Sequence, residues 1–185
     1  MTSSDTPDPG SSGSATFRLA LAGVLVLLLI ASLGSLIWLK AGRRGEAEGL
    51  QRAREAAMAQ AGQFMLRMGT YGPDLLDDRG GMPEYRTRVK AVITPKFATS
   101  FDKQAGTAEQ LVAQAGVERQ AKVHATGISA IDSDSATALV AGTFTDSYAK
   151  GGQQEPAPFR IEVSLVKTDG KWLVDNFSPV TGAEG

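Results

Sequence analysis

The sequence of 185 residues contains no cysteine and one histidine, His124. The absence of cysteine excludes disulfide bonds, thiolate metal sites, thiol nucleophiles and the lipid-modified cysteine that ends a lipoprotein signal. A single histidine without a cysteine or second histidine beside it does not build an ordinary zinc site. If the folded part lies outside the cytoplasm, packing alone must hold it together.

A charge excess of either sign is also absent. The chain has 19 basic and 20 acidic residues, which gives a formal net charge of −1. No overall field therefore attracts nucleic acid or anionic substrates. We expect no nucleic-acid partner.

The stretch 1–16 is rich in Ser, Thr, Pro, Gly and Asp and cannot bury a core. The residues beyond it and beyond an apolar run suffice for one domain and are too few for two ordinary ones. We therefore predict a disordered N-terminal tail at 1–16, a transmembrane helix at 17–40, a basic juxtamembrane linker at 41–45, an α+β globular domain at 46–180 and a C-terminal tail at 181–185.

The apolar run from Leu19 to Leu39 carries no charged residue. As a helix it spans about 30 Å, the thickness of the hydrocarbon core of a bilayer. Trp38 stands where an interfacial aromatic residue anchors a membrane helix. The alternatives are a buried core helix and a cleaved signal peptide, which has a shorter apolar region and an exit of small residues. The run predicts an uncleaved single-pass anchor, so the lipid bilayer is the first expected partner, through Leu19 to Leu39.

The basic residues that flank this run bear on its orientation. Arg18 precedes the run, whereas Lys40, Arg43 and Arg44 follow it. Acidic neighbours do little to offset this difference, because the rule concerns Lys and Arg rather than net charge. The count alone predicts that the globular domain faces the cytoplasm.

The first half of the globular domain is predicted to be helical. Between Glu46 and Met68, apolar residues recur at three- and four-residue spacings, which indicates an amphipathic helix whose alanine-rich face packs on a sheet. A coiled-coil seam is the alternative, but sustained heptads are lacking. Glycine and proline residues divide the rest of this half into shorter segments. We expect a stop at Gly69 to Pro73, a turn at Leu75 and Leu76, a helix from Pro83 that Thr94 and Pro95 end, and a third short helix at Phe97 to Phe101 or at Ala108 to Ala115.

After Gly116 the pattern changes to extended runs separated by polar and glycine-rich breaks. In the third run apolar residues alternate with polar ones, as in a sheet with one buried and one wet face. Helices followed by antiparallel strands predict an α+β domain in which the helices cover one face of a curved sheet. The expected strands are Ala121 to Ile131, Ala136 to Tyr148, Phe159 to Lys167 and Lys171 to Phe177.

The dipeptide Asp169-Gly170 is the strongest short hairpin signal in the chain. A two-residue loop fixes the pairing of the last two strands and brings Trp172 and Val174 to the buried face. A three-residue loop would change this register. The pairs predicted from the two-residue loop are Trp172 with Lys167, Val174 with Leu165, Asp175 with Ser164 and Asn176 with Val163.

The run from Arg160 to Val180, with its Thr-Asp-Gly-Lys-Trp-Leu-Val and Phe-Ser-Pro-Val, resembles the closing hairpin of Mce-associated membrane proteins. These are small partners of the mammalian-cell-entry lipid importers. The order of parts is also similar, including the segment Tyr85 to Phe97 with its Val-Ile-Thr-Pro-Lys-Phe. Similar hairpins close many other members of the nuclear-transport-factor-2-like superfamily.

This resemblance implies a nuclear-transport-factor-2-like fold, also described as SnoaL-like or cystatin-like, in which N-terminal helices cover a cone-shaped antiparallel sheet. It also implies a domain on the outer side of the bacterial cytoplasmic membrane, a non-enzymatic role and assembly with Mce-type importer subunits. It supplies no catalytic, cofactor-binding or metal-binding residues. The implied orientation is opposite to the one that the flanking charges predict.

Polar residues that could belong to a site are explained first as sheet or loop residues. His124 is expected to be a half-buried sheet residue, and no spacing supports a catalytic triad with Ser133 or Ser135. The pair Asp77 and Asp78 follows a turn. The pair Asp132 and Asp134 lacks the glycine and the distal glutamate of a calcium-binding loop. The acidic residues expected to be solvated in loops are Asp77, Asp78, Asp132 and Asp134.

A pocket between sheet and helices would allow a second interpretation, an enzyme of the polyketide-cyclase or ketosteroid-isomerase type that pairs a carboxylate with a tyrosine. The predicted register places Asp175 on the wetter face, so such a dyad is hard to assemble. Trp172, Phe177 and Tyr85 are interpreted first as core or rim packing. The residues available for a dyad are Tyr71, Tyr85, Tyr148 and Asp175.

We therefore expect a membrane-tethered, non-catalytic interaction subunit. An exposed sheet face or loop would bind a partner protein, and the open sheet face is also a candidate homodimer surface. The anchor would raise the effective concentration of the domain beside membrane complexes. A pocketed enzyme and a scaffold subunit of a conjugation or secretion channel are the alternatives.

Overall fold

The computed structural model describes residue 32 and residues 48–180. The predicted tails at 1–16 and 181–185, the linker at 41–45 and, apart from Ser32, the transmembrane helix at 17–40 lie outside the described residues. Within the described part, none of the helices combines the length and the hydropathy needed to cross a membrane. The described residues belong to two units divided after Leu50, and in the first of these the described positions are helical.

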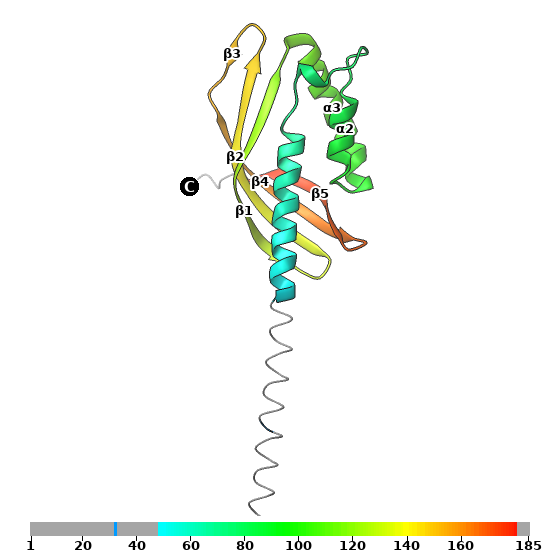
Figure 1. The fold of residues 1–185 in the computed structure, drawn as a ribbon, viewed down its shortest axis with the longest axis vertical. Helices are drawn as coiled ribbons and strands as arrows, with labels where there is room; N and C mark the ends of the chain where they lie inside the picture. The colour runs from blue at the N-terminus through cyan, green and yellow to red at the C-terminus, as the bar shows by residue number, and fades with distance from the viewer. Residues whose placement is uncertain (1–31, 33–47, 181–185) are drawn as a thin grey trace, which may run out of the picture. The chain divides into compact units, whose positions relative to one another are not determined.

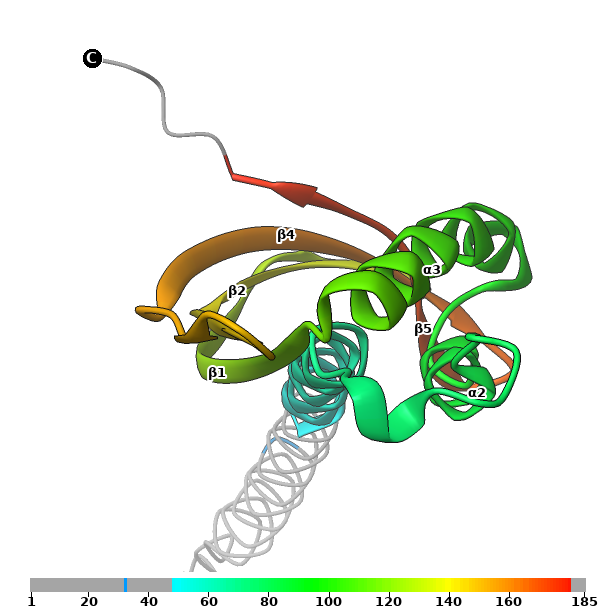
Figure 2. The same cartoon turned by 90° about the horizontal axis from the view of Figure 1, so that it is seen from above.

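The second unit consists of helices followed by an antiparallel sheet (Figure 1). The sheet has the order β1-β2-β4-β5, with β3 paired to β2. It is curved, and the helices lie on its concave side (Figure 2). The predicted α+β class, with helices packed against an antiparallel sheet, is confirmed. After a first helix, whose part in this unit is residues 51–68, the elements are η1 (Pro73–Leu75), α2 (Pro83–Lys90), α3 (Pro95–Ala115), β1 (Glu118–Ile131), β2 (Ser135–Tyr148), β3 (Gly152–Gln153), β4 (Ala157–Thr168) and β5 (Lys171–Pro179).

The first helix confirms the predicted alanine-rich stripe. Its buried side chains belong to the same hydrophobic cluster as Val140, Val163 and Leu165 on the inner face of the sheet. In β4 these buried residues alternate with exposed ones, as the predicted strand pattern requires. Small side chains on the stripe allow the helix to approach the strands closely. The buried residues of the stripe are Ala57, Ala61, Phe64 and Met65.

The hairpin between β4 and β5 has the predicted two-residue turn. Asp169 and Gly170 have φ angles of 51° and 77°, and positive values at both central residues are typical of a type I′ turn. The register next to the turn is the predicted one. The confirmed pairs are Lys167 with Trp172 and Leu165 with Val174.

Further along β5 the ladder contains a β-bulge that the sequence did not predict. Asp175 has no partner in the β4–β5 ladder, and Ser164 pairs with Asn176. The predicted pairs of Asp175 with Ser164 and of Asn176 with Val163 are therefore wrong. Phe177 lies opposite Val163 and packs against the core.

The segment expected to end the second helix instead begins the third. Thr94 is the N-cap of α3, because its hydroxyl accepts a hydrogen bond from the Phe97 amide at 3.1 Å, and Pro95 is the first helical residue. The same hydroxyl donates to the Asp175 carboxylate at 2.8 Å, and Lys96 Nζ donates to its other oxygen at 2.8 Å. The start of α3 therefore holds the bulge of β5.

The two alternative short helices predicted at 97–101 and 108–115 are parts of one helix, α3. Its buried residues recur every three or four positions, so a continuous stripe faces the core. Gly116 ends the helix with a φ of 59°, the left-handed conformation that glycine adopts without strain. The buried residues of α3 are Phe97, Phe101, Ala105, Glu109 and Val112.

Candidate functional site

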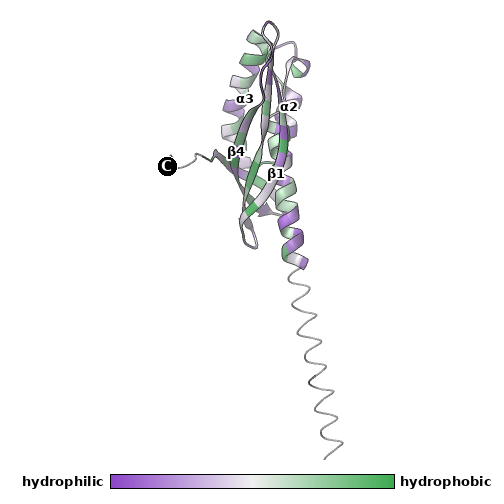
Figure 3. Cartoon of the chain, turned by 90° about the vertical axis from the view of Figure 1, so that its left-hand side faces the viewer, coloured by the Kyte–Doolittle hydropathy of each residue, from purple (hydrophilic) through white to green (hydrophobic). Residues whose placement is uncertain are grey.

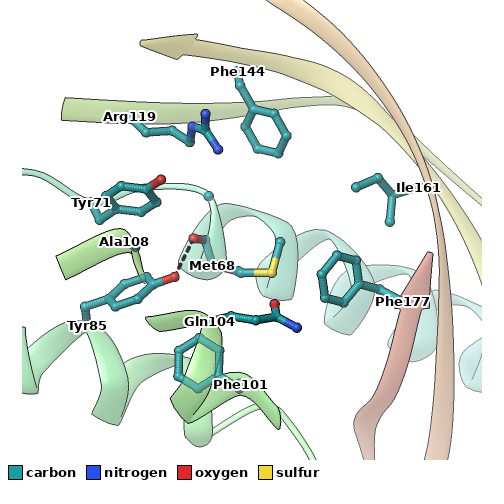
Figure 4. Close-up of a pocket in the computed structure, with 11 residues that line it drawn as sticks. Met68, Tyr71, Tyr85, Phe101, Gln104, Ala108, Arg119, Phe144, Ile161 and Phe177 are labelled. Atoms are coloured by element: carbon teal, nitrogen blue, oxygen red, sulfur yellow. Dashed lines mark hydrogen bonds between the residues drawn. The ribbon is translucent and has the colours of Figure 1, made fainter. Parts of the chain in front are cut away.

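A pocket of about 270 Å³ lies between the concave face of the sheet and the helices (Figure 4). Its walls come from the end of the first helix, from α2 and α3 and from the sheet. Most of the lining is apolar, and the polar side chains are those of Tyr71, Tyr85, Gln104 and Arg119. The residues that line the pocket are Met68, Gly69, Tyr71, Tyr85, Phe101, Gln104, Ala108, Arg119, Phe144, Ile161 and Phe177.

Tyr71 and Arg119 form one end of this pocket (Figure 4). Their backbones pair in an isolated bridge, in which the Tyr71 amide donates to the Arg119 carbonyl at 3.0 Å and the Arg119 amide donates to the Tyr71 carbonyl at 2.8 Å. The guanidinium lies 5.8 Å from the centre of the Tyr71 ring and 5.1 Å from that of Phe144. Cation–π contacts thus hold a charged group against an apolar wall.

The Arg119 guanidinium is paired with Asp146 of β2. Nε donates to Oδ1 and Nη2 donates to Oδ2, both at 2.7 Å, so the pair is bidentate. These hydrogen bonds hold the pKa of the Asp146 carboxyl below its ordinary value and raise the pKa of Arg119. Both groups are therefore ionised at neutral pH, and their charges offset each other.

The two tyrosines of the pocket differ in their hydrogen bonding. The Tyr85 hydroxyl donates to the Met68 carbonyl at 3.0 Å, whereas the Tyr71 hydroxyl has no hydrogen-bond partner within residues 48–180. The two rings meet edge to face at 5.5 Å. Burial raises the pKa of both phenols, so both are protonated at neutral pH.

The lining offers hydrogen-bond donors and apolar surface rather than acid–base chemistry. No carboxylate or imidazole is among the residues that line the pocket. The phenols have raised pKa values and Arg119 is paired, so no lining group exchanges a proton near neutral pH. In the part of the chain that the structure describes, no group of acidic or histidine residues is placed to hold a metal ion.

The structure brings together two of the four residues considered for an enzymatic dyad, Tyr71 and Tyr85. Tyr148 is 40% exposed and does not line the pocket. Asp175 is held outside the pocket by the start of α3. The pocket lining therefore contains no carboxylate–tyrosine dyad. The prediction that such a dyad is hard to assemble depended on pairing Asp175 with Ser164, and that pairing is wrong.

Arg119 and Gln104 are lining residues that the sequence does not predict. Gln104 lies in a polar stretch of α3, and Arg119 lies near the start of β1 among other polar residues. Only the bridge between Tyr71 and Arg119, which joins segments far apart in sequence, brings the guanidinium to the pocket. No local spacing would have revealed either residue.

His124 is exposed on β1, so the prediction of a half-buried residue is wrong. It lies on an edge strand, and its Nε2 is 3.3 Å from Thr143 Oγ1 of the neighbouring strand. Ser133 lies in the turn after β1 and Ser135 at the start of β2, so both are more than about 20 Å from His124 at the rise of a strand. The structure assembles no triad from these three residues.

The acidic residues predicted to be solvated lie in exposed loops. The Asp77 carboxylate accepts hydrogen bonds from the amides of Arg79 at 2.9 Å and Gly81 at 2.8 Å, which stabilises a turn. This pattern needs no metal ion. The others, Asp78, Asp132 and Asp134, are exposed.

The three aromatic residues interpreted as packing residues do pack against the core. Tyr85 is 3% exposed and Trp172 is 6% exposed. Phe177 is half-buried, and its ring lies 5.6 Å from that of Phe64 and 5.8 Å from that of Phe97. The bulge at Asp175 is what turns Phe177 toward these rings.

The face of the sheet turned away from the helices carries a shallow apolar hollow of about 270 Å³. Figure 3 shows the strands coloured by hydropathy, with apolar and polar residues mixed along them. Leu139 of β2 and Val180, just after β5, are each 44% exposed there. Leu139 is paired with Gly127 of β1 and Glu162 of β4, so it stands near the middle of the sheet. We call this surface the outer patch, and it consists of Ala125, Leu139, Ala141, Arg160 and Val180.

Mycobacterial sequences are similar to this chain over most of its length. The family model described as "Uncharacterized protein Rv1363c/MT1408-like" matches residues 15–179. "Uncharacterized protein MT1407" of Mycobacterium tuberculosis (strain CDC 1551 / Oshkosh) is 28% identical over 162 residues, which are 85% of this chain and 70% of that protein. "Uncharacterized protein Rv1363c" of Mycobacterium tuberculosis (strain ATCC 25618 / H37Rv) is 26% identical over 157 residues, which are 85% of this chain and 56% of that protein.

Two solved structures with partial likeness are a transfer protein and a secretion-system protein. The putative transfer protein TraH from the Gram-positive conjugative plasmid pIP501 has 15% identity and a TM-score of 0.47, over 71% of this chain and 96% of that one. An IcmL-like type IV secretion system protein from Legionella pneumophila has 10% identity and a TM-score of 0.48, over 68% of this chain and 92% of that one.

Proposed function

We propose that this chain, which belongs to the Rv1363c/MT1408-like family, is a membrane-anchored, non-catalytic accessory subunit of a bacterial Mce-type lipid importer. The apolar run from Leu19 to Leu39 is its anchor in the cytoplasmic membrane. Its folded domain lies on the outer side and binds an importer subunit through the outer patch. The function needs no cofactor and no nucleic acid.

The observation that carries this proposal is the outer patch. Leu139 is exposed between Ala138 and Val140, which are 0% and 1% exposed, so the sheet is apolar on both faces at this point. Arg160 and Glu162 stand beside it on β4, and neither has an ion-pair partner within residues 48–180. An apolar centre with a charged rim is typical of a protein-binding surface.

The pocket supports the non-catalytic part of the proposal. An isomerase or dehydratase of this architecture would need a carboxylate that faces the cavity, and the lining contains none. The carboxylate of Asp146, which lies beside the lining residue Arg119, is engaged by it through two hydrogen bonds. The pocketed enzyme is therefore the less favoured alternative.

The anchor and the last hairpin support the choice of partner. A membrane anchor keeps the domain at high effective concentration beside other membrane proteins, so a modest interface suffices for assembly. The run from Arg160 to Val180, which resembles Mce-associated proteins, contributes Arg160 and Val180 to the outer patch itself. Importer subunits are therefore the partners to test first.

Crosslinking from the rim of the outer patch tests this interface. A photoreactive amino acid at Glu162, in the full-length chain in native membranes, is expected to give a crosslink to an Mce-type importer subunit, identified by mass spectrometry. Leu139→Glu should reduce its yield about fivefold or more, because a charge would enter the apolar centre. Leu111→Glu is the matched control, because Leu111 is 48% exposed on α3, and it should leave the yield unchanged.

Three outcomes would contradict this assignment. A yield that is unaffected by Leu139→Glu would place the partner on another surface. A crosslink to a second copy of the chain would indicate a homodimer through the sheet. A crosslink to the ATPase of a conjugation or secretion channel would favour the scaffold alternative.

Fusion reporters after Gly185 test the orientation. Alkaline phosphatase fused there should be active, and green fluorescent protein fused there should be dark, because the first folds to activity outside the cytoplasm and the second fluoresces inside. The reverse pattern would contradict the proposed topology. It would agree instead with the Lys and Arg count around the apolar run.

A further inference from the structure

We propose that the pocket under the sheet binds a short neutral amphipathic molecule, with a carbonyl or hydroxyl head at the Tyr71 and Arg119 end and a hydrocarbon body toward Phe177 and Ile161. The axis is visible in Figure 4, where the two polar side chains and the two apolar ones lie at opposite ends with Met68 between them. This site goes beyond the proposed accessory role. It is independent of the outer patch, which is on the other face of the sheet.

The polar end presents donors that lack acceptors. Arg119 uses Nε and Nη2 for Asp146, and its Nη1 has no hydrogen bond within residues 48–180. The Tyr71 hydroxyl has no partner in the same range, whereas the Tyr85 hydroxyl is occupied by the Met68 carbonyl. The free groups at this end can therefore all donate, and the complementary ligand group is an acceptor.

The charge balance of this end favours a neutral acceptor over an anion. The carboxylate of Asp146 lies 2.7 Å from the guanidinium, so the positive charge of Arg119 is already offset. Burying an additional anion would cost desolvation energy without a free counter-charge. An ammonium head at this end would lie beside the guanidinium, and the like charges would repel. A ketone, an ester, an amide or an alcohol meets none of these obstacles.

The rest of the pocket fits a hydrocarbon body of limited length. Phe101, Phe144, Ile161 and Phe177 line it with carbon, and Gln104 is the one polar side chain outside the tyrosines and Arg119. A volume of about 270 Å³ holds about nine water-sized groups at roughly 30 Å³ each. An eight-carbon ketone such as 2-octanone therefore matches both the size and the polarity.

Binding can be measured in the full-length chain in lipid nanodiscs with 13C-labelled methionine methyl groups. Met68 lines the pocket, and Met82, which is 0% exposed and outside the lining, is an internal reference. The probes are 2-octanone, octanoate and octylammonium. We expect 2-octanone to shift the Met68 signal in a saturable way, octanoate to bind about tenfold more weakly, and octylammonium to give no saturable shift.

Two variants separate a ligand site from a packing defect. Tyr71→Phe removes only a hydroxyl that makes no internal hydrogen bond, and it should weaken 2-octanone binding about fivefold without changing the fold. Ala108→Leu should abolish the saturable shift by filling the pocket. Ala113→Leu, at an exposed position of the same helix, is the matched control and should bind normally.

The remaining outcomes would overturn the inference. Octanoate binding as tightly as 2-octanone would make the site an anion site. Equal binding by the wild type and by Tyr71→Phe would remove the acceptor head from the proposal. An unchanged Met68 signal with every probe, or an equal shift in Ala108→Leu, would show that the cavity is not a ligand site. None of these results depends on the crosslinks made through the outer patch.

Discussion

Replacing Trp172 by alanine is expected to lower the free energy of unfolding by about 3–5 kcal/mol. The indole is 6% exposed and lies where β5 meets the first helix and the segment after α2, with Ala56 and Val92 nearby. Lys167 Nζ covers it from β4, 5.6 Å from the ring centre. Truncation would remove this buried area and leave a cavity that the paired strands cannot collapse to fill.

Hydrogen–deuterium exchange of the amides of β4 in the full-length chain measures this loss, because β4 is paired on both sides and its most protected amides are expected to exchange through global unfolding. Trp172→Phe should cost much less, since it keeps an aromatic ring in the site. Tyr148→Ala is the surface control, because Tyr148 is 40% exposed. A Trp172→Ala variant as stable as this control would show that the indole serves a contact surface rather than the core.

The sequence predicts the hairpin correctly as far as its local signals extend. The Asp169-Gly170 turn sets the register through Val174, because a two-residue loop leaves one pairing that buries Trp172. The next residue, Asp175, is bulged because it bonds to Thr94 and Lys96, about 80 residues earlier in the chain. A tertiary contact of this kind has no local sequence pattern.

The division of α3 into two candidate helices has a different cause. The stripe of buried residues runs through Ala105 and Glu109, and a charged residue on an apolar stripe interrupts the hydrophobic period. Glu109 is nevertheless buried because α2 supplies its partners. Only the contact between α2 and α3 explains why a charged residue lies on the buried stripe of α3.

The pocket is a further example of what local sequence patterns cannot predict. Tyr71 and Tyr85 were considered because of their residue type, and both line the pocket. Arg119, the only charged residue of the lining, was missed because the bridge that positions it joins two distant segments. Residue type can suggest candidates, but the pairing of distant segments decides which of them meet.

Replacing Glu109 by alanine is expected to cost about 2–3 kcal/mol of unfolding free energy. Its Oε1 accepts hydrogen bonds from the Met82 amide at 2.9 Å and from Arg86 Nε at 2.7 Å, and its Oε2 accepts one from Arg86 Nη2 at 2.6 Å. Alanine would leave a buried amide without a partner at the start of α2. Arg86 would keep only Asp102, at 2.9 Å, which moderates the loss.

The dependence of stability on pH distinguishes this ion pair from simple packing. The hydrogen bonds from Arg86, and then that from the Met82 amide, hold the pKa of Glu109 below its ordinary value of 4.5. A carboxyl with a lowered folded-state pKa contributes stability above its unfolded pKa, and that contribution is lost as the pH falls through the folded value. Thermal unfolding followed by far-UV circular dichroism should therefore show a falling midpoint below about pH 4.5.

Glu109→Gln should reduce the fall of the unfolding midpoint at acidic pH, because the amide side chain does not take up a proton there. A slope would remain, since hydrogen bonds donated by Lys90, Arg119 and Lys96 also lower the pKa of Asp102, Asp146 and Asp175 respectively. Glu84→Gln, at an exposed position of α2, is the matched control for loss of one acidic charge. Identical acid profiles for the Glu109→Gln, Glu84→Gln and wild-type chains would show that the Glu109 pair does not couple the two helices electrostatically. The helices would then depend on the apolar stripe of α3 alone.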